Sequence, residues 1–171
     1  MNLPNRITLI RILFIPLLVY YLLSPNLPYN KLISVVIFVS VALSDAVDGY
    51  VARKLKQVTT LGMFLDPVAD KILVISALLC LVELRAISAV PVIIVIFRDL
   101  AIMGLRLAAS TSGRIIAADS LGKTKAAVLD LAAAMLILGL PYGNEVLWIG
   151  VALSVISGIE YFYKNRRVLN G

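Results

Sequence analysis

The chain has 171 residues, of which 61% are hydrophobic and 15% are charged, and its mean hydropathy is +0.98. Soluble domains have about half apolar residues and about a quarter charged ones, so this composition excludes a soluble globular protein and predicts an integral membrane protein. A membrane-spanning helix takes about 20 residues. Six spans would use about 120 residues and leave roughly 50 for connections, whereas seven would leave almost none.

The sequence contains no histidine and a single cysteine, Cys80. Without histidine, His-dependent catalytic triads and ordinary zinc enzymes are excluded. Metal chemistry would have to use oxygen ligands, which favour hard cations such as Mg²⁺ or Mn²⁺. The net charge of the chain is +6. In a membrane protein, an excess of lysine and arginine usually lies in the cytoplasmic loops, so we do not take this charge as a sign of nucleic-acid binding.

Six apolar segments predict six helices, most of them separated by turn-forming residues. In chain order they span residues 7–23, 31–53, 66–84, 90–109, 121–140 and 145–163. No low-complexity stretch or linker divides the chain, so we expect one domain over residues 1–171. The predicted fold class is all-α, an integral membrane bundle of six transmembrane helices.

Lysine and arginine gather at one set of helix ends, and the opposite ends carry only Lys31 and Arg85. By the positive-inside rule, the lysine-rich ends face the cytoplasm. Both termini are then cytoplasmic, as are the second-to-third and fourth-to-fifth loops. We therefore expect a multi-pass protein of the plasma membrane.

Four of the ten acidic residues fall where the second segment ends and the third begins. Asp45 and Asp48 are three residues apart, and Asp66 and Asp70 are four apart, so each pair shares a helix face. A carboxylate at the bilayer centre costs on the order of 2.5–3.5 kcal/mol. We interpret the four as ligands of two Mg²⁺ or Mn²⁺ ions. The alternative is that they are solvated charges paired with nearby lysines and arginines.

The fourth and fifth segments contribute cations. Arg98 and Arg106 are eight residues apart and so lie near one helix face, and Lys123 begins the fifth segment. Asp99 adjoins Arg98 in sequence but is expected to point elsewhere. Such a cluster predicts an acceptor that carries its own phosphate; the alternative is the ordinary cytoplasmic excess of lysine and arginine.

Small residues recur at every fourth position of the sixth segment, at Gly150, Ser154 and Gly158. This spacing gives a smooth helix face and predicts close helix packing in lipid. We expect no chemical role for these residues.

Eight positions of the second and third segments resemble the signature of a known family, the CDP-alcohol phosphotransferases. They read Asp45-x₂-Asp48-Gly49-x₂-Ala52-Arg53-x₈-Gly62-x₃-Asp66-x₃-Asp70. Members of this family transfer a phosphatidyl or related group from a CDP-linked donor to an alcohol and release CMP. The resemblance implies a metal-dependent transferase with its active site facing the cytoplasm.

The resemblance also implies roles for single residues. Asp45, Asp48 and Asp66 would be metal ligands, and Asp70 would both contact a metal and act as the catalytic base. The residues implied to bind the CDP group are Asp45, Gly49, Ala52, Arg53 and Gly62. Paired divalent ions suit this chemistry because they neutralise a diphosphate and stabilise its leaving group.

Residues 2–11, 97–106 and 121–125 resemble bacterial members that use glycerol 3-phosphate as acceptor. This resemblance implies transfer of the phosphatidyl group of CDP-diacylglycerol to glycerol 3-phosphate, with Arg98, Arg106 and Lys123 holding the acceptor's phosphate. One departure is Asp99, where many such members have glutamate. The implied partners are the two substrates and membrane lipids, and the resemblance is compatible with a homodimer.

Other interpretations stay open from sequence. The acceptor could instead be inositol phosphate, serine or phosphatidylglycerol. In a different class, a small divalent-cation transporter would also carry acidic helices, although its carboxylates should lie near the midplane of the membrane. A membrane scaffold without catalysis would leave the carboxylates without a purpose.

Overall fold

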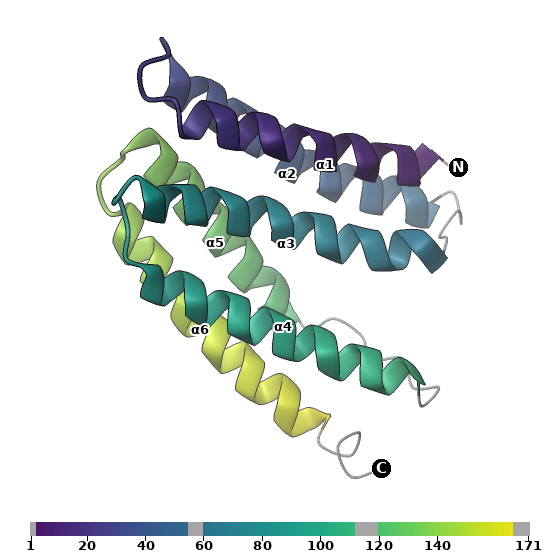
Figure 1. Ribbon diagram of the computed structural model, residues 1–171. Coiled ribbons are helices and arrows are strands. Elements are labelled where there is room, and N and C mark those ends of the chain that lie inside the picture. The colour runs from purple at the N-terminus through teal and green to yellow at the C-terminus, as the bar shows by residue number, and fades with distance from the viewer. Residues whose placement is uncertain (1–2, 55–59, 112–119, 166–171) are drawn as a thin grey trace. The chain divides into compact units, whose positions relative to one another are not determined.

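The computed structural model describes residues 3–54, 60–111 and 120–165, and all regular structure in these ranges is helical. The helices, seen in Figure 1, are α1 (Leu3–Leu22), α2 (Asn30–Lys54), α3 (Thr60–Glu83), α4 (Ala89–Thr111), α5 (Ser120–Leu138) and α6 (Gly143–Lys164). Each corresponds to one of the six predicted apolar segments. The all-α prediction is therefore confirmed for the described part of the chain.

Four of the helices, α2, α4, α5 and α6, both begin and end within two residues of the predicted limits. The differences lie at the start of α1, which begins at Leu3, and of α3, which begins at Thr60 and not at Asp66 as predicted. Both predicted starts were wrong, because each helix begins several residues before the apolar segment from which it was predicted. Asp66 and Asp70 therefore lie inside α3, more than one turn from its first residue.

The chain divides into two compact units, one of residues 1–87 with 133–140 and the other of residues 88–132 with 141–171. In the first unit, α1, α2 and α3 lie side by side (Figure 1). Their apolar side chains are almost completely buried at Leu18, Phe38, Leu73 and Leu78. These contacts hold together the two helices, α2 and α3, that carry the acidic signature.

The end of α5 also belongs to the first unit. Gly139 follows the helix with a φ of 71°, in the left-handed region where a side chain would be strained. A Cβ atom at Gly139 would lie 3.3 Å from Lys31 Nζ. The first turn of α2 and the end of α5 therefore lie close together.

In the second unit, α4 packs along α6 (Figure 1). The first part of α5 meets α6 at Gly150, where a Cβ atom would lie 2.7 Å from Leu129 Cδ2. Glycine is needed here because any side chain would displace Leu129. The predicted close packing along the small-residue face of the sixth segment is confirmed at this position.

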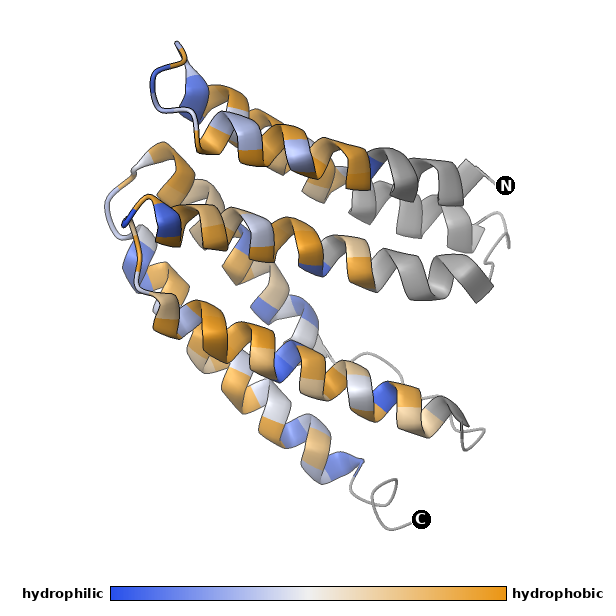
Figure 2. Ribbon diagram, viewed as in Figure 1, coloured by the Kyte–Doolittle hydropathy of each residue, from blue (hydrophilic) through white to orange (hydrophobic). Residues whose placement is uncertain are grey.

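Within the described residues, one helix, Gly143–Lys164, is long and apolar enough to cross a membrane by length and composition. The apolar stretches of α1 and α2 that the structure describes are shorter, Arg11–Leu22 and Asn30–Ser44. In α4 and α5 the apolar sequence is interrupted by charged residues, seen as blue bands in Figure 2. Large apolar side chains are nevertheless exposed, including Leu13 and Phe97 at 73% and 75%.

Candidate functional site

The eight signature positions lie on α2 and α3. These two helices contact each other in the first unit, so both acidic pairs belong to one unit. The side chains of the signature lie outside the described part of the structure; they are those of Asp45, Asp48, Gly49, Ala52, Arg53, Gly62, Asp66 and Asp70. Their predicted roles in binding metal and CDP stay predictions.

The described side chains contain no group of three acidic or cysteine residues that could hold a metal ion. The acidic signature, whose side chains are not described, is the part of the sequence with the right donors. Its four carboxylates supply only oxygen ligands, a donor set that fits Mg²⁺ or Mn²⁺.

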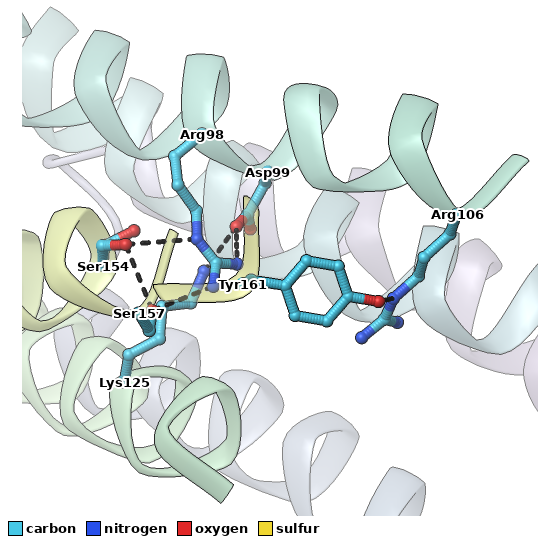
Figure 3. Close-up of polar contacts among 7 residues, drawn as sticks. All are labelled: Arg98, Asp99, Arg106, Lys125, Ser154, Ser157 and Tyr161. Carbon is cyan, nitrogen blue, oxygen red and sulfur yellow. Dashed lines mark hydrogen bonds and ion pairs between the residues drawn. The ribbon is translucent and has the colours of Figure 1, made fainter. Parts of the chain in front are cut away.

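Arg98 lies in the middle of α4 and reaches across to α6. Its Nε atom donates a hydrogen bond to the carbonyl oxygen of Ser154 at 3.1 Å, and Nη2 donates to Ser157 Oγ at 2.8 Å. Its Nη1 atom donates to Asp99 Oδ1 at 2.9 Å. All three nitrogens of this guanidinium therefore have a partner within the protein (Figure 3).

The prediction that Asp99 points away from Arg98 is wrong. Asp99 is buried, and its Oδ1 atom accepts hydrogen bonds from both Arg98 Nη1 and Lys125 Nζ, the latter at 2.5 Å. A buried carboxylate is costly unless it is paired and hydrogen-bonded. The long Arg98 side chain can bend back to its sequence neighbour, and Lys125 reaches the same oxygen from α5.

The small residues of α6 do more than allow helices to approach. Ser157 Oγ accepts from Arg98 and donates to the Ser154 carbonyl oxygen at 3.1 Å. A Cβ atom at Gly158 would lie 3.0 Å from Arg98 Cγ and 3.4 Å from its Nε. Glycine at this position lets the arginine lie against the helix. Sequence reasoning missed Ser157 and assigned Ser154 and Gly158 to packing alone.

Arg106 lies two turns further along α4 and also faces α6. Its Nε atom donates to the Tyr161 hydroxyl at 2.9 Å, and its guanidinium carbon lies 5.3 Å from the centroid of the Tyr161 ring. Because Arg98 and Arg106 both bond to α6, the prediction that they share one face of α4 is confirmed. Among the described residues, Arg106 has no ion pair with an acidic side chain, unlike Arg98.

Lys123 lies in the first turn of α5, and its side chain is exposed. Lys125, two residues later, is buried and forms an ion pair with Asp99. The three residues predicted to hold the acceptor's phosphate, Arg98, Arg106 and Lys123, thus belong to one unit of the structure. The partners Tyr161 and Ser157 could not be predicted from periodicity, although an arginine inside an apolar helix signals that some partner must exist.

Comparison with known proteins identifies the family. Residues 1–156 match the CDP-alcohol phosphatidyltransferases. The chain belongs to this family. Membership confirms the resemblance carried by the eight signature positions, and the matched region extends from α1 into α6.

Three curated relatives cover most of the chain. A CDP-diacylglycerol–glycerol-3-phosphate 3-phosphatidyltransferase of Bacillus subtilis is 40% identical over 98% of this chain and 97% of its own length. The protein of that name from Rickettsia bellii is 32% identical over 94% of this chain and 93% of its own. CDP-diacylglycerol–glycerol-3-phosphate 3-phosphatidyltransferase 2 of Arabidopsis thaliana is 32% identical over 98% of this chain and 81% of its own length.

CDP-alcohol phosphatidyltransferases are transferases and generally depend on a divalent metal ion. The four aspartates of the signature on α2 and α3 are oxygen donors, the kind of ligand that such an ion needs. The cations of the second unit are a separate feature that the family signature does not contain.

Proposed function

We propose that the protein transfers the phosphatidyl group of CDP-diacylglycerol to sn-glycerol 3-phosphate, giving phosphatidylglycerophosphate and CMP in phospholipid biosynthesis. The observation that carries this proposal is the 40% identity to a relative named for that reaction, over nearly the full length of both chains. The complete acidic signature of the sequence supports it.

On the donor side, we assign Asp45, Asp48, Asp66 and Asp70 to two Mg²⁺ or Mn²⁺ ions. Bound there, the ions would neutralise the diphosphate and stabilise the negative charge that develops on the leaving phosphate. With no more than a methyl group as side chain, Gly49, Ala52 and Gly62 would leave room for the cytidine group. Arg53 and Asp45 complete the proposed CDP contacts.

Asp70 would take the proton from the acceptor's primary hydroxyl group. The hydroxyl oxygen then forms a bond to the phosphorus that carries the diacylglycerol. The bond from that phosphorus to the CMP oxygen breaks, and CMP leaves with the electron pair. A carboxylate is the base available in a chain without histidine.

On the acceptor side, we assign the phosphate of glycerol 3-phosphate to Arg98, Arg106 and Lys123. Arg106 and Lys123 suit direct contact, because Arg106 has no acidic partner among the described residues and Lys123 is exposed. Each terminal nitrogen of Arg98 carries a second N–H beyond the bond that it already donates. An arginine that has no ion pair within the described part of the chain favours an acceptor that carries phosphate over serine.

The same proposal includes the membrane arrangement. We infer six spans in the plasma membrane, both termini and the active site on the cytoplasmic side, and one domain over residues 1–171. The support is the distribution of lysine and arginine along the sequence. Membrane lipids would cover exposed apolar side chains such as those of Leu13, Phe97 and Ile159.

The proposal is tested with the purified protein in detergent. CDP-diacylglycerol is offered with glycerol 3-phosphate, inositol phosphate, serine or phosphatidylglycerol in turn, and the CMP released is quantified. We expect release with glycerol 3-phosphate. Faster release with another acceptor would overturn the acceptor assignment, and no release with any of them would overturn the reaction. Uptake of Mg²⁺ into proteoliposomes without CMP release would favour a transporter.

A further inference from the structure

The hydroxyl group of Tyr161 on α6 meets the side chain of Arg106 on α4 (Figure 3). The oxygen accepts a hydrogen bond from Arg106 Nε at 2.9 Å, and the guanidinium carbon is 5.3 Å from the ring centroid. The tyrosine therefore contacts the arginine through both its polar end and its ring. The function proposed above gives Tyr161 no role.

The tyrosine ring is held firmly in place. Tyr161 is 3% exposed and forms a buried cluster with Ile102 and Leu105 of α4, against which Phe162 packs. Ile102 and Leu105 lie four residues and one residue before Arg106 on the same helix. The position of the hydroxyl is thus fixed by the packing of α6 against the very turn of α4 that carries the arginine.

The hydrogen bond determines which edge of the guanidinium remains for a ligand. With Nε occupied by Tyr161, the outer edge of Arg106 is formed by Nη1 and Nη2, for which the described part of the chain provides no acceptor. Two parallel N–H groups of this kind suit bidentate binding of a phosphate. At Arg98, by contrast, each nitrogen already donates to a protein oxygen.

We propose that Tyr161 is a positioning residue of the acceptor site, which holds Arg106 with its terminal nitrogens free to bind the phosphate of the acceptor. The inference rests on the proposed function, because it takes that phosphate as the ligand of Arg106. A side chain fixed before binding loses less conformational entropy when the ligand arrives. Tyr161 should therefore act on acceptor affinity and not on the chemical step.

The test is Tyr161→Phe, which removes the hydroxyl and keeps the packed ring. We expect the KM for glycerol 3-phosphate to rise about three- to tenfold, the range that one net hydrogen bond supports. The kcat and the KM for CDP-diacylglycerol should stay within about twofold. The matched control is Tyr163→Phe, the same change at a residue of α6 that is 69% exposed, and it should leave all three parameters unchanged.

A double variant tests whether Tyr161 acts through Arg106. In an Arg106→Ala background, Tyr161→Phe should raise the KM for glycerol 3-phosphate no further, because the atom that it positions is gone. Additive effects would overturn the proposal. So would an unchanged KM for glycerol 3-phosphate in Tyr161→Phe, or an equal loss in every parameter, which would indicate general damage to the fold.

The wild-type protein separates this inference from the function on which it rests. If the wild type releases CMP with glycerol 3-phosphate and Tyr161→Phe behaves like the control, only the role of Tyr161 is overturned. If the wild type releases no CMP with glycerol 3-phosphate, the proposed function fails and the role of Tyr161 fails with it.

Discussion

The Asp99 carboxylate lies 2.5 Å from the Lys125 ammonium group, and this ion pair joins α4 to α5. Both side chains are more than nine-tenths buried, and Asp99 also accepts a hydrogen bond from Arg98. One carboxylate thus contacts two cations inside the second unit. It is the centre of a polar network that includes Ser154 and Ser157 of α6.

Lys125→Met should destabilise the protein, because it leaves Asp99 with one cation fewer in a buried position. Removing one partner of a buried ion pair costs about 3–5 kcal/mol when the other charge is left uncompensated, so the loss here should be smaller, because Asp99 keeps its contact with Arg98. Asp99→Leu should cost more, because it removes the carboxylate that both Arg98 and Lys125 contact. Thermal unfolding in detergent measures both variants, and an Asp99→Leu variant at least as stable as Lys125→Met would contradict the prediction.

Gly158→Ala should weaken the contact between α4 and α6. The added Cβ would lie 3.0 Å from Arg98 Cγ, and overpacking of this kind costs about 1–3 kcal/mol. The matched control is Gly104→Ala in α4, where no atom lies within 4 Å of the added Cβ. The control should be neutral or slightly stabilising because alanine favours helix. Equal unfolding temperatures for the two variants would refute the prediction.

Activity should require Mg²⁺ or Mn²⁺ and be lost in excess chelator. Asp45→Asn, Asp48→Asn and Asp66→Asn should each lower kcat by orders of magnitude in a folded protein, because each removes a charged metal ligand. Glu145→Gln, an exposed carboxylate of α6, is the control and should retain full activity. CMP release measures the effect, and full turnover in EDTA would exclude a catalytic metal.

Arg106→Ala should raise the KM for glycerol 3-phosphate about ten- to a hundredfold and spare the KM of the lipid donor, because a charge-assisted contact to phosphate is lost. Asp70→Asn should instead lower kcat, since loss of the base leaves acceptor binding intact. Initial rates of CMP release with each substrate varied in turn distinguish the two variants. The assignment fails if both variants change the same parameter.

The membrane orientation can be tested by labelling single cysteines with an impermeant reagent in a Cys80→Ala background. Asn26→Cys and Asn144→Cys should react from outside the cell, and Lys123→Cys only after the membrane is opened. Labelling of position 123 in intact cells would invert the proposed topology.

The sequence was sufficient for the helices because hydropathy marks apolar segments directly. It was also sufficient for the family, because the chemistry of the acidic signature is concentrated in two neighbouring segments. It was insufficient for the network around Arg98. Ser157 and Tyr161 lie more than fifty residues from their arginine partners, and no periodic pattern connects residues that meet only through packing of α4 on α6.

The interpretation of Asp99 failed for a related reason. Adjacent residues of a helix leave it in different directions, but the flexible arginine side chain can bend back to its neighbour. Burial decides the outcome, because a buried carboxylate must be paired, and Asp99 contacts both Arg98 and Lys125. The starts of α1 and α3 were misplaced because apolar character shows where a helix is embedded and not where it begins.

The ammonium group of Lys31 lies beside Gly139, at the C-terminal end of α5. The last carbonyl groups of a helix carry a partial negative charge, and a cation near them stabilises that end. Lys31 lies where α5 finishes, so its ammonium group complements the dipole of that helix. This gives a structural role to one of the two cations at the helix ends that otherwise lack lysine and arginine. A charge that weakens the orientation signal of the sequence thus stabilises the end of a helix.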